Sequence, residues 1–150
     1  MDKVDKKILQ YLQQDGRLTN AELAEKVHVS PATCHRRTQQ LFEQGYIEEV
    51  RALVNPKKVD LGALVLVGVV LDRSTKESFA LFESAIKPLP FILDCYLVAG
   101  DFDYFLKVRV ADMADFNHLH SEQLLALPSV RQLRTFFVMK EVQDNAPLFF

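Results

Sequence analysis

Residues 18–45 form two short helical patterns, each with its own start signal, joined by a turn of only three residues. In the first pattern Thr19 stands where an N-cap is expected and Glu22 follows three residues later, which is the spacing of a capping box. In the second, Ser30 is a favoured N-cap and Pro31 occupies the first helical position, where a missing N–H costs nothing. So short a connection prevents the two helices from lying parallel. The pattern therefore predicts a helix-turn-helix, whose second helix enters the major groove of DNA.

The second of these helices has two chemically different faces. On an ideal helix Cys34 and Leu41 fall on one side, with Thr38 and Phe42 near them, and we expect this side to dock into the domain. The opposite side is polar, and its residue types suit base reading, because arginine pairs with guanine, glutamine with adenine, and Thr or Ala methyl groups with thymine. A merely solvated face is the alternative. We predict that base reading centres on Thr33, His35, Arg36 and Gln40, within a DNA-contact set of Ser30, Ala32, Thr33, His35, Arg36, Arg37 and Gln40.

The flanking segments complete a first domain, residues 1–54. Upstream, apolar residues recur at helical spacing over residues 4–12 and stop at Gly16, so a helix of about three turns packs behind the pair. Downstream, residues 46–54 alternate like two short strands and predict a small wing. The wing glutamates would be repelled by phosphate, which leaves Arg51 as its one plausible contact with the DNA backbone.

A polar, turn-rich linker at residues 55–62 leads to a second domain, residues 63–150. This domain alternates between apolar, strand-like runs and helical periods in the order βαββαβ. That order is typical of a ferredoxin-like (ACT-like) sandwich, an α+β fold whose helices cover one face of the sheet. The expected elements are strand 63–71, helix 78–86, strands 91–98 and 104–110, helix 112–127 and strand 133–142.

The charge of the chain argues for assembly into oligomers. Its formal net charge is −2, and residues 1–60 hold only ten Lys and Arg against nine Asp and Glu. Neutralising phosphates supplies much of the affinity of proteins for DNA, so a single copy should bind weakly and several linked copies are needed. The first strand of the second domain is apolar on both sides and suits pairing with a second copy. The apolar residues 147–150 offer another such surface, or a frayed end.

A second candidate site is the turn at residues 100–104, between two apolar strands. Glycine and aspartate are common turn residues, so this turn can be purely structural. Two carboxylates able to hold an ammonium group, beside strand-end backbone and a tyrosine, also suit a zwitterion. On this interpretation Gly100, Asp101, Asp103 and Tyr104 bind a small amino acid.

Motifs along nearly the whole chain resemble those of the Lrp/AsnC (feast/famine) family of transcriptional regulators. Several spaced motifs in one order are far more specific than any of them alone. They are Asp5-x-x-Ile8-Leu9, Asp15-Gly16-Arg17, Ser30-Pro31 to Cys34 and Arg37, Leu41 to Gly45 and Ile47, Asn55-Pro56, Gly100-Asp101-Phe102-Asp103-Tyr104, and Thr135-Phe136-Phe137-Val138.

The resemblance implies a winged helix-turn-helix joined to a sandwich that dimerises, with dimers forming octamers around which DNA wraps. It also implies that an effector, usually an amino acid, binds between dimers near residues 100–104, with Thr135 and Phe137 close by, and changes assembly or DNA affinity. Such a protein would be a cytoplasmic, nucleoid-associated regulator of a bacterium or archaeon. Two recognition helices in adjacent major grooves would read a palindromic duplex. His28 stands where the family commonly has glycine, but histidine tolerates positive φ.

Other classes of protein fit the sequence less well. The nearest histidines, His118 and His120, fall on different sides of a predicted helix, so we expect neither an enzyme nor a cofactor. A metal site that joins them to Asp115 or Glu122 is less favoured than a solvated helix face. No apolar run is long enough for a membrane span. The remaining alternative is an architectural DNA-binding protein without an effector.

Overall fold

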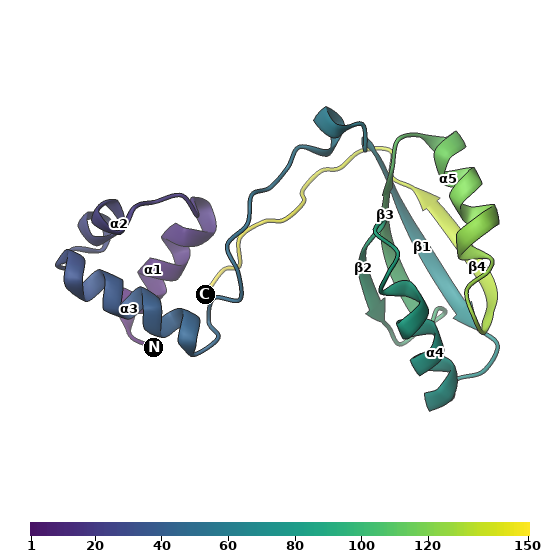
Figure 1. The fold of residues 1–150 in the computed structure, drawn as a ribbon, viewed down its shortest axis with the longest axis horizontal. Coiled ribbons are helices and arrows are strands. Elements are labelled where there is room, and N and C mark those ends of the chain that lie inside the picture. Colours follow the sequence, from purple (N-terminus) through teal and green to yellow (C-terminus); the bar gives the residue numbers. More distant parts are fainter. The chain divides into compact units, whose positions relative to one another are not determined.

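The computed structural model describes residues 1–150, which divide into two compact units (Figure 1). The first unit contains Met1–Val54 together with Val142–Phe150, and the second contains Asn55–Glu141. Residues 142–150, expected in the second domain, make their contacts within the first unit. No helix in either unit is both long enough and apolar enough to cross a membrane.

The first unit is built from three helices, α1 (Lys3–Gln14), α2 (Asn20–Val27) and α3 (Pro31–Glu43). The capping box predicted for α2 is present: Glu22 N donates to Thr19 Oγ1 at 3.2 Å, and Thr19 N donates to Glu22 Oε2 at 2.8 Å. These bonds satisfy backbone N–H groups that a helix start leaves without partners. The helices enclose a small apolar core made of Ile8, Leu9, Leu23, Ala24, Val27, Cys34 and Leu41.

The turn between α2 and α3 has the geometry that the sequence requires. His28 ends α2 with φ 58° and ψ 48°, in the left-handed region where glycine is usual. Asn20 Nδ2 donates to Pro31 O at 2.8 Å and so ties the start of α2 to the first turn of α3. The turn therefore tolerates histidine, and the angle between the two helices is fixed by a hydrogen bond as well as by packing.

The two short strands expected over residues 46–54 are not formed in this structure. Residues 46–54 contain no strand and have no ladder partner. The start of this segment instead closes α3: Gly45 has φ 75°, and Tyr46 N donates to Leu41 O at 2.9 Å, as in a Schellman ending. An isolated two-stranded hairpin is marginal in water, so the rest of the segment has no local reason to pair.

The second unit is a two-layer α+β sandwich, which confirms the predicted fold class and element order. Its sheet has the strand order β2-β3-β1-β4, and every neighbouring pair is antiparallel. The elements are η1 (Pro56–Val59), β1 (Ala63–Leu71), α4 (Lys76–Ile86), β2 (Ile92–Leu97), β3 (Tyr104–Val110), α5 (Met113–Leu119), a π-helical turn η2 (His120–Leu124) and β4 (Val130–Phe137).

Two predicted boundaries in this unit were wrong. The helix expected over residues 112–127 gives way to η2 after Leu119. The last strand spans residues 130–137 rather than 133–142, because it is an edge strand that pairs only with β1. Edge positions accept polar side chains, so the strand begins before its apolar run. It ends beside the start of β1, where Val138 N donates to Leu64 O at 3.0 Å.

The two faces of the sheet differ in what covers them. On one face alternate residues of β1 and β3 pack against Phe82 of α4 and Phe116 of α5 in the main core. The other face carries no helix, as Figure 1 shows. It is lined by alternate residues of the same strands, including Leu64, Leu66 and Phe105, together with Phe136 of β4. An apolar face without a cover is a candidate for pairing with another copy.

The uncovered face also holds a buried charge. Arg109 is only 7% exposed, and both terminal nitrogens of its guanidinium donate to the carboxylate of Glu141, Nη1 to Oε2 at 3.1 Å. A bidentate pair of this kind satisfies both charges where water is largely excluded. It fixes the chain just after β4.

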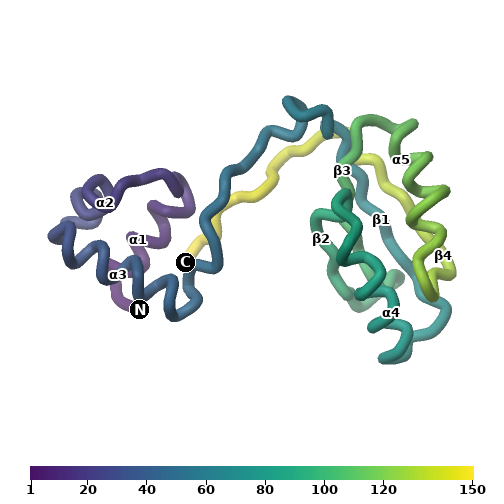
Figure 2. The backbone as a smooth tube through the Cα atoms, viewed as in Figure 1, coloured from purple at the N-terminus to yellow at the C-terminus, as the bar shows by residue number.

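The tail that follows Glu141 lies against α1 (Figure 2). The side-chain amide of Gln13 both donates to Leu148 O at 3.2 Å and accepts from Leu148 N at 2.7 Å. Gln10 Nε2 donates to Phe150 O at 2.9 Å. The alternative of a frayed end is therefore wrong for the backbone of this tail, although the side chains of Leu148 and Phe149 stay exposed.

Replacing Gly68 of β1 should destabilise the second unit. A Cβ at this position would lie 2.6 Å from the ring of Phe102, which packs over the strand. Gly68→Ala should lower the free energy of unfolding by about 1–3 kcal/mol, the usual cost of overpacking. Gly62→Ala is the matched control, since the nearest atom there is 3.6 Å away. Urea unfolding at one protein concentration measures both, and equal stability of the two variants would contradict this packing.

Candidate DNA-binding surface and effector site

The recognition helix α3 presents the two faces that the sequence predicts. Cys34 is fully buried and Leu41 is 3% exposed, so this side anchors the helix. Phe42, expected on the same side, is 42% exposed. On the opposite side Arg36 Nη1 donates to Gln40 Oε1 at 3.2 Å, which orders two of the predicted base-reading side chains. The exposed residues on that side are Ala32, His35, Arg36, Gln39 and Gln40.

Ser30 and Thr33 form the start of the helix. Thr33 N donates to Ser30 Oγ at 3.2 Å, and Ser30 Oγ donates to Thr33 Oγ1 at 2.9 Å. Their side chains thus cap α3 and lie at its N-terminal end, where backbone N–H groups favour phosphate. Ser30 and Thr33 therefore lie at the N-terminal end of α3, the end expected to enter the major groove first.

Arg37, one of the predicted DNA contacts, forms ion pairs with two carboxylates of the first unit. Its Nη1 lies 2.7 Å from Asp2 Oδ2 and 2.9 Å from Asp5 Oδ1, and its side chain is 24% exposed. These hydrogen bonds raise the pKa of Arg37, Asp5 contributing most. Asp2 also caps α1, accepting from Val4 N and Asp5 N. Arg37 therefore clamps α3 to the first turn of α1, and its contact with DNA stays a prediction.

The turn at residues 100–104 is closed and anchored by its own backbone. Gly100 has φ 140°, a conformation that L side chains rarely adopt. Val98 N donates to Asp103 O at 2.9 Å, and Asp103 N donates to Val69 O at 2.8 Å. The turn is thus held at the end of the central strand β1. Such a rigid platform can position a ligand-binding group.

The two carboxylates of the turn differ in use. Asp103 is half-buried, and its Oδ2 accepts a hydrogen bond from Leu71 N at 2.8 Å, at the end of β1. This bond is structural, since a carboxylate that accepts a backbone N–H fastens one segment to another. Asp101 is exposed and lies at the tip of the same turn. Only Asp101 combines an exposed carboxylate with a fixed backbone position.

Tyr104 points away from the turn into the core. It is 1% exposed, packs on Phe82 with ring centroids 4.5 Å apart, and its hydroxyl donates to Glu83 Oε1 at 2.7 Å. Burial, and then the contact with Glu83, raise the pKa of Tyr104 well above its ordinary value. The structure therefore does not bring this ring to the exposed side of the turn with Asp101, as the sequence analysis expected.

On β4 the structure brings a different residue to the turn from the two that the sequence predicts. Thr135 and Phe137 lie on the helix-covered face, where the ring of Phe137 is 5.4 Å from that of Phe116. Phe136, between them, lies on the uncovered face with its ring centroid 6.3 Å from that of Phe102. The alternation of side chains along a strand separates neighbouring residues in this way.

Arg134 is a candidate that sequence reasoning missed. Its guanidinium lies 5.9 Å from the centroid of Phe102, so a cation stands beside the residue that follows Asp101 in the chain. The sequence signal that could have identified Arg134 is the alternation of side chains along β4, which places Arg134 and Phe136 on the same face of the sheet. Asp101 and Arg134 carry the opposite charges that a zwitterion needs.

Neither a metal centre nor a reactive thiol is assembled in the chain. No three His, Cys, Asp or Glu side chains are grouped to hold a metal ion, and His118 instead lies 3.2 Å from Glu122. Both cysteines are free; burial raises the pKa of Cys95 to about 11, so its thiol stays protonated at neutral pH.

Comparison with known proteins covers both units. A family model described as winged helix-turn-helix DNA-binding matches residues 1–48, and one described as the Lrp/AsnC ligand binding domain matches residues 64–148. The leucine-responsive regulatory protein of Klebsiella pneumoniae is 44% identical over 145 residues, 97% of this chain and 88% of the relative. That of Escherichia coli K12 is 43% identical over the same shares.

Solved structures agree with these matches. A transcriptional regulator from Neisseria meningitidis, solved as a complex with L-Met, superposes with a TM-score of 0.94 at 37% identity, covering 99% of this chain and 96% of that one. An AsnC family transcriptional regulator from Agrobacterium tumefaciens gives a TM-score of 0.93 at 32% identity over the same shares. The likeness therefore extends through both units.

Arg36 and Arg37 should affect DNA binding in different ways. Arg36→Ala should relax base preference at one position in each half-site by about 1–3 kcal/mol, because an exposed arginine can read a base edge. Arg37→Ala should lower the stability of the first unit and weaken binding to all sequences alike, because it releases α3 from α1. Binding of each variant to a panel of duplexes with single base changes separates the two effects. The same pattern for both variants would contradict these assignments.

Acid should weaken the first unit through Asp2. Hydrogen bonds from Asp5 N and then Arg37 lower the pKa of Asp2 below its ordinary 3.8. A carboxylate whose pKa is lower in the folded state than in the unfolded state stabilises the fold at pH values above its unfolded pKa. This contribution is lost as the pH falls through the folded pKa. Asp2→Ala should therefore be less stable than wild type near neutral pH, with the gap closing in acid.

Urea midpoints across this pH range measure the gap, and Glu25→Ala, at an exposed position on α2, is the control. A gap for Asp2→Ala that does not change with pH would contradict the role given to the carboxylate.

Proposed function

The chain belongs to the Lrp/AsnC family of transcriptional regulators, and on that premise we propose that a small amino acid, bound beside the turn at residues 100–104, controls its affinity for DNA or its assembly. The coarser function, a DNA-binding regulator with a ligand-binding domain, follows from the family itself. What the proposal adds is regulation by a bound amino acid.

One observation carries the proposal: the turn keeps an exposed carboxylate on a rigid support. Asp103 is used to hold the turn on β1, so Asp101 is free to pair with an ammonium group. Arg134, beside Phe102, supplies a cation for the carboxylate of the same ligand. Relatives named leucine-responsive, and a solved relative in complex with L-Met, support an amino acid as the ligand. Thr135 and Phe137 are then support for β4 rather than direct contacts.

The proposed DNA recognition uses α3 of two subunits. Each α3 enters a major groove, so the operator is palindromic double-stranded DNA with half-sites about one helical turn, or a multiple of it, apart. Thr33, His35, Arg36 and Gln40 read the bases, and the capped helix start near Ser30 approaches phosphate.

In this proposal, assembly of several copies supplies the DNA affinity that the net charge of a single copy does not. With a net charge of −2, one copy gains little from phosphate neutralisation, and linked copies raise the effective concentration at DNA. We propose that the uncovered sheet face, with Leu64, Leu66 and Phe105, pairs two copies, and that dimers assemble further into an octamer. A nucleoid-associated role in the cytoplasm of a bacterium or archaeon goes with this proposal.

An architectural DNA-binding protein without an effector is the second candidate. The bond from Leu71 N to Asp103 favours it, because a purely structural turn would need that contact and nothing more. The two candidates differ in whether a free amino acid changes the stability or assembly of the protein.

Asp101→Ala should abolish the response to the effector without unfolding the protein. An exposed side chain with no partner should change the free energy of unfolding by less than about 0.5 kcal/mol. An amino acid at 100 times its dissociation constant should stabilise wild type by about 2.7 kcal/mol, and the variant not at all. Thermal unfolding with each standard amino acid measures this, with Glu77→Ala, an exposed carboxylate on α4, as the control.

If wild type responds to no amino acid, the architectural candidate is favoured. If wild type, Asp101→Ala and Glu77→Ala all respond equally, the effector binds elsewhere.

A further inference from the structure

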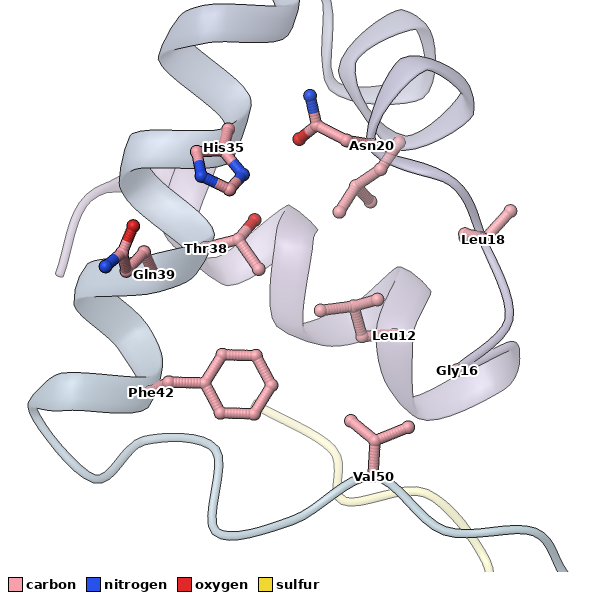
Figure 3. A pocket seen from close by; sticks show the side chains of 10 residues that line it. Leu12, Gly16, Leu18, Asn20, His35, Thr38, Gln39, Phe42 and Val50 are labelled. Atoms are coloured by element: carbon pink, nitrogen blue, oxygen red, sulfur yellow. The ribbon is translucent and has the colours of Figure 1, made fainter.

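A cavity of about 370 Å³ opens in the first unit, and His35 is the one residue in its wall that belongs to the predicted DNA-contact set. It lies where the end of α1, the start of α2 and one side of α3 meet (Figure 3). Its volume falls within the range of small-molecule sites. Because α3 is the recognition helix, a molecule held here would touch the element that reads DNA.

The walls of this cavity are mostly apolar and carry no fixed charge. Leu12, Leu18, Leu23, Phe42 and Val50 line it, and no Asp, Glu, Lys or Arg does. A charged ligand would lose water without gaining an oppositely charged partner, which is unfavourable. The cavity therefore suits an uncharged molecule and disfavours the amino-acid zwitterion proposed for the other unit.

One polar atom in the wall has no hydrogen-bond partner. Thr38 Oγ1 is buried and makes no hydrogen bond, and Figure 3 shows this side chain between Phe42 and Asn20 at the cavity. Buried hydroxyl groups nearly always have partners, so each exception needs an explanation. Because Oγ1 itself is buried, rotation about χ1 of Thr38 is needed to bring the hydroxyl to the cavity, where a ligand with one donor or acceptor would complete it.

The cavity is also accessible, since Val50 in its wall belongs to the unpaired segment after α3 and is 54% exposed. No segment of this chain fills it. The most obvious apolar candidate in the same unit, Phe149, is fully exposed.

We propose that this cavity binds a small, uncharged, largely apolar molecule that hydrogen-bonds to Thr38, and that its binding changes the affinity of α3 for DNA. His35 and Gln39, both on α3, lie in the wall. Contact with a bound molecule changes which orientations of these side chains are favoured, and His35 is among the predicted base readers. The two ligand sites are separable, because one requires charges and the other excludes them.

Indole is a direct probe of the site. The chain contains no tryptophan, so fluorescence excited beyond the tyrosine band comes from the probe alone. Titrating full-length protein into indole should shift its emission to the blue and saturate. Val50→Phe, which fills the cavity from an exposed position, should remove the shift, whereas Val54→Phe, in the same segment but outside the wall, should keep it. No shift, or a shift that survives Val50→Phe, would overturn the site.

Thr38→Val tests the hydrogen bond. The variant keeps the shape of the side chain and should bind indole about three- to tenfold more weakly, the usual range for one hydrogen bond. Leucine and methionine should not displace the probe. Unchanged affinity in Thr38→Val, or displacement by either amino acid, would refute the proposed chemistry.

Coupling to DNA is measured separately by titrating a labelled duplex with protein in the presence and absence of saturating indole. Affinity should change by about fivefold or more in wild type and Val54→Phe, and should not change in Val50→Phe. An equal affinity with and without indole in wild type would overturn the coupling. Since indole binding is read without an effector amino acid, these results do not depend on the proposed effector site.

Discussion

The contact between Arg37 and the two carboxylates at the start of α1 holds the recognition helix in place. The guanidinium reaches Asp2 and Asp5 at once, and Asp2 caps α1 with the same carboxylate. Apolar packing through Cys34 and Leu41 fixes the depth of α3 in the domain, but packing alone is not directional. The ion pair adds direction, and the bond from Asn20 to Pro31 O fixes the other end of the helix. The exposed face of α3 therefore depends on contacts made behind it.

Local chemistry made much of this structure predictable. Thr19, Glu22 and Ser30 have partners within three residues, so their caps could be read from spacing. The strands of the second unit could be read from their apolar runs, and the fold followed from the order of elements. The left-handed backbone conformation at His28 was also predictable, because its energetic cost depends only on the type of that one residue.

Contacts between distant residues could not be predicted in the same way. The structural role of Arg37 could not be predicted, because its partners Asp2 and Asp5 lie more than thirty residues away in the sequence. Asp103 looks like a free carboxylate until Leu71 N is found beside it. The contacts of the tail with the first unit were not predictable, because its partners are the glutamines of α1 and nothing local marks Gln13 as a partner for backbone groups.

In the second unit, the two aspartates of one turn have different roles. Asp103 fastens the turn to β1 and Asp101 stays at its exposed tip. In the proposed effector site, this division keeps the binding carboxylate rigid without involving it in folding, which lowers the entropic cost of holding a ligand. It also explains why a change at Asp103 would mix loss of structure with loss of binding, whereas a change at Asp101 reports on binding.

The most direct measurement is a selection of binding sites from a random duplex pool, with full-length protein, in the presence and absence of a mixture of the standard amino acids. The account predicts enrichment of a palindrome whose half-sites are spaced by about one helical turn or a multiple of it, and a recovery that changes when the mixture is added. Failure to enrich any sequence would contradict specific recognition by α3. An enriched palindrome recovered equally in both conditions would contradict control by an amino acid.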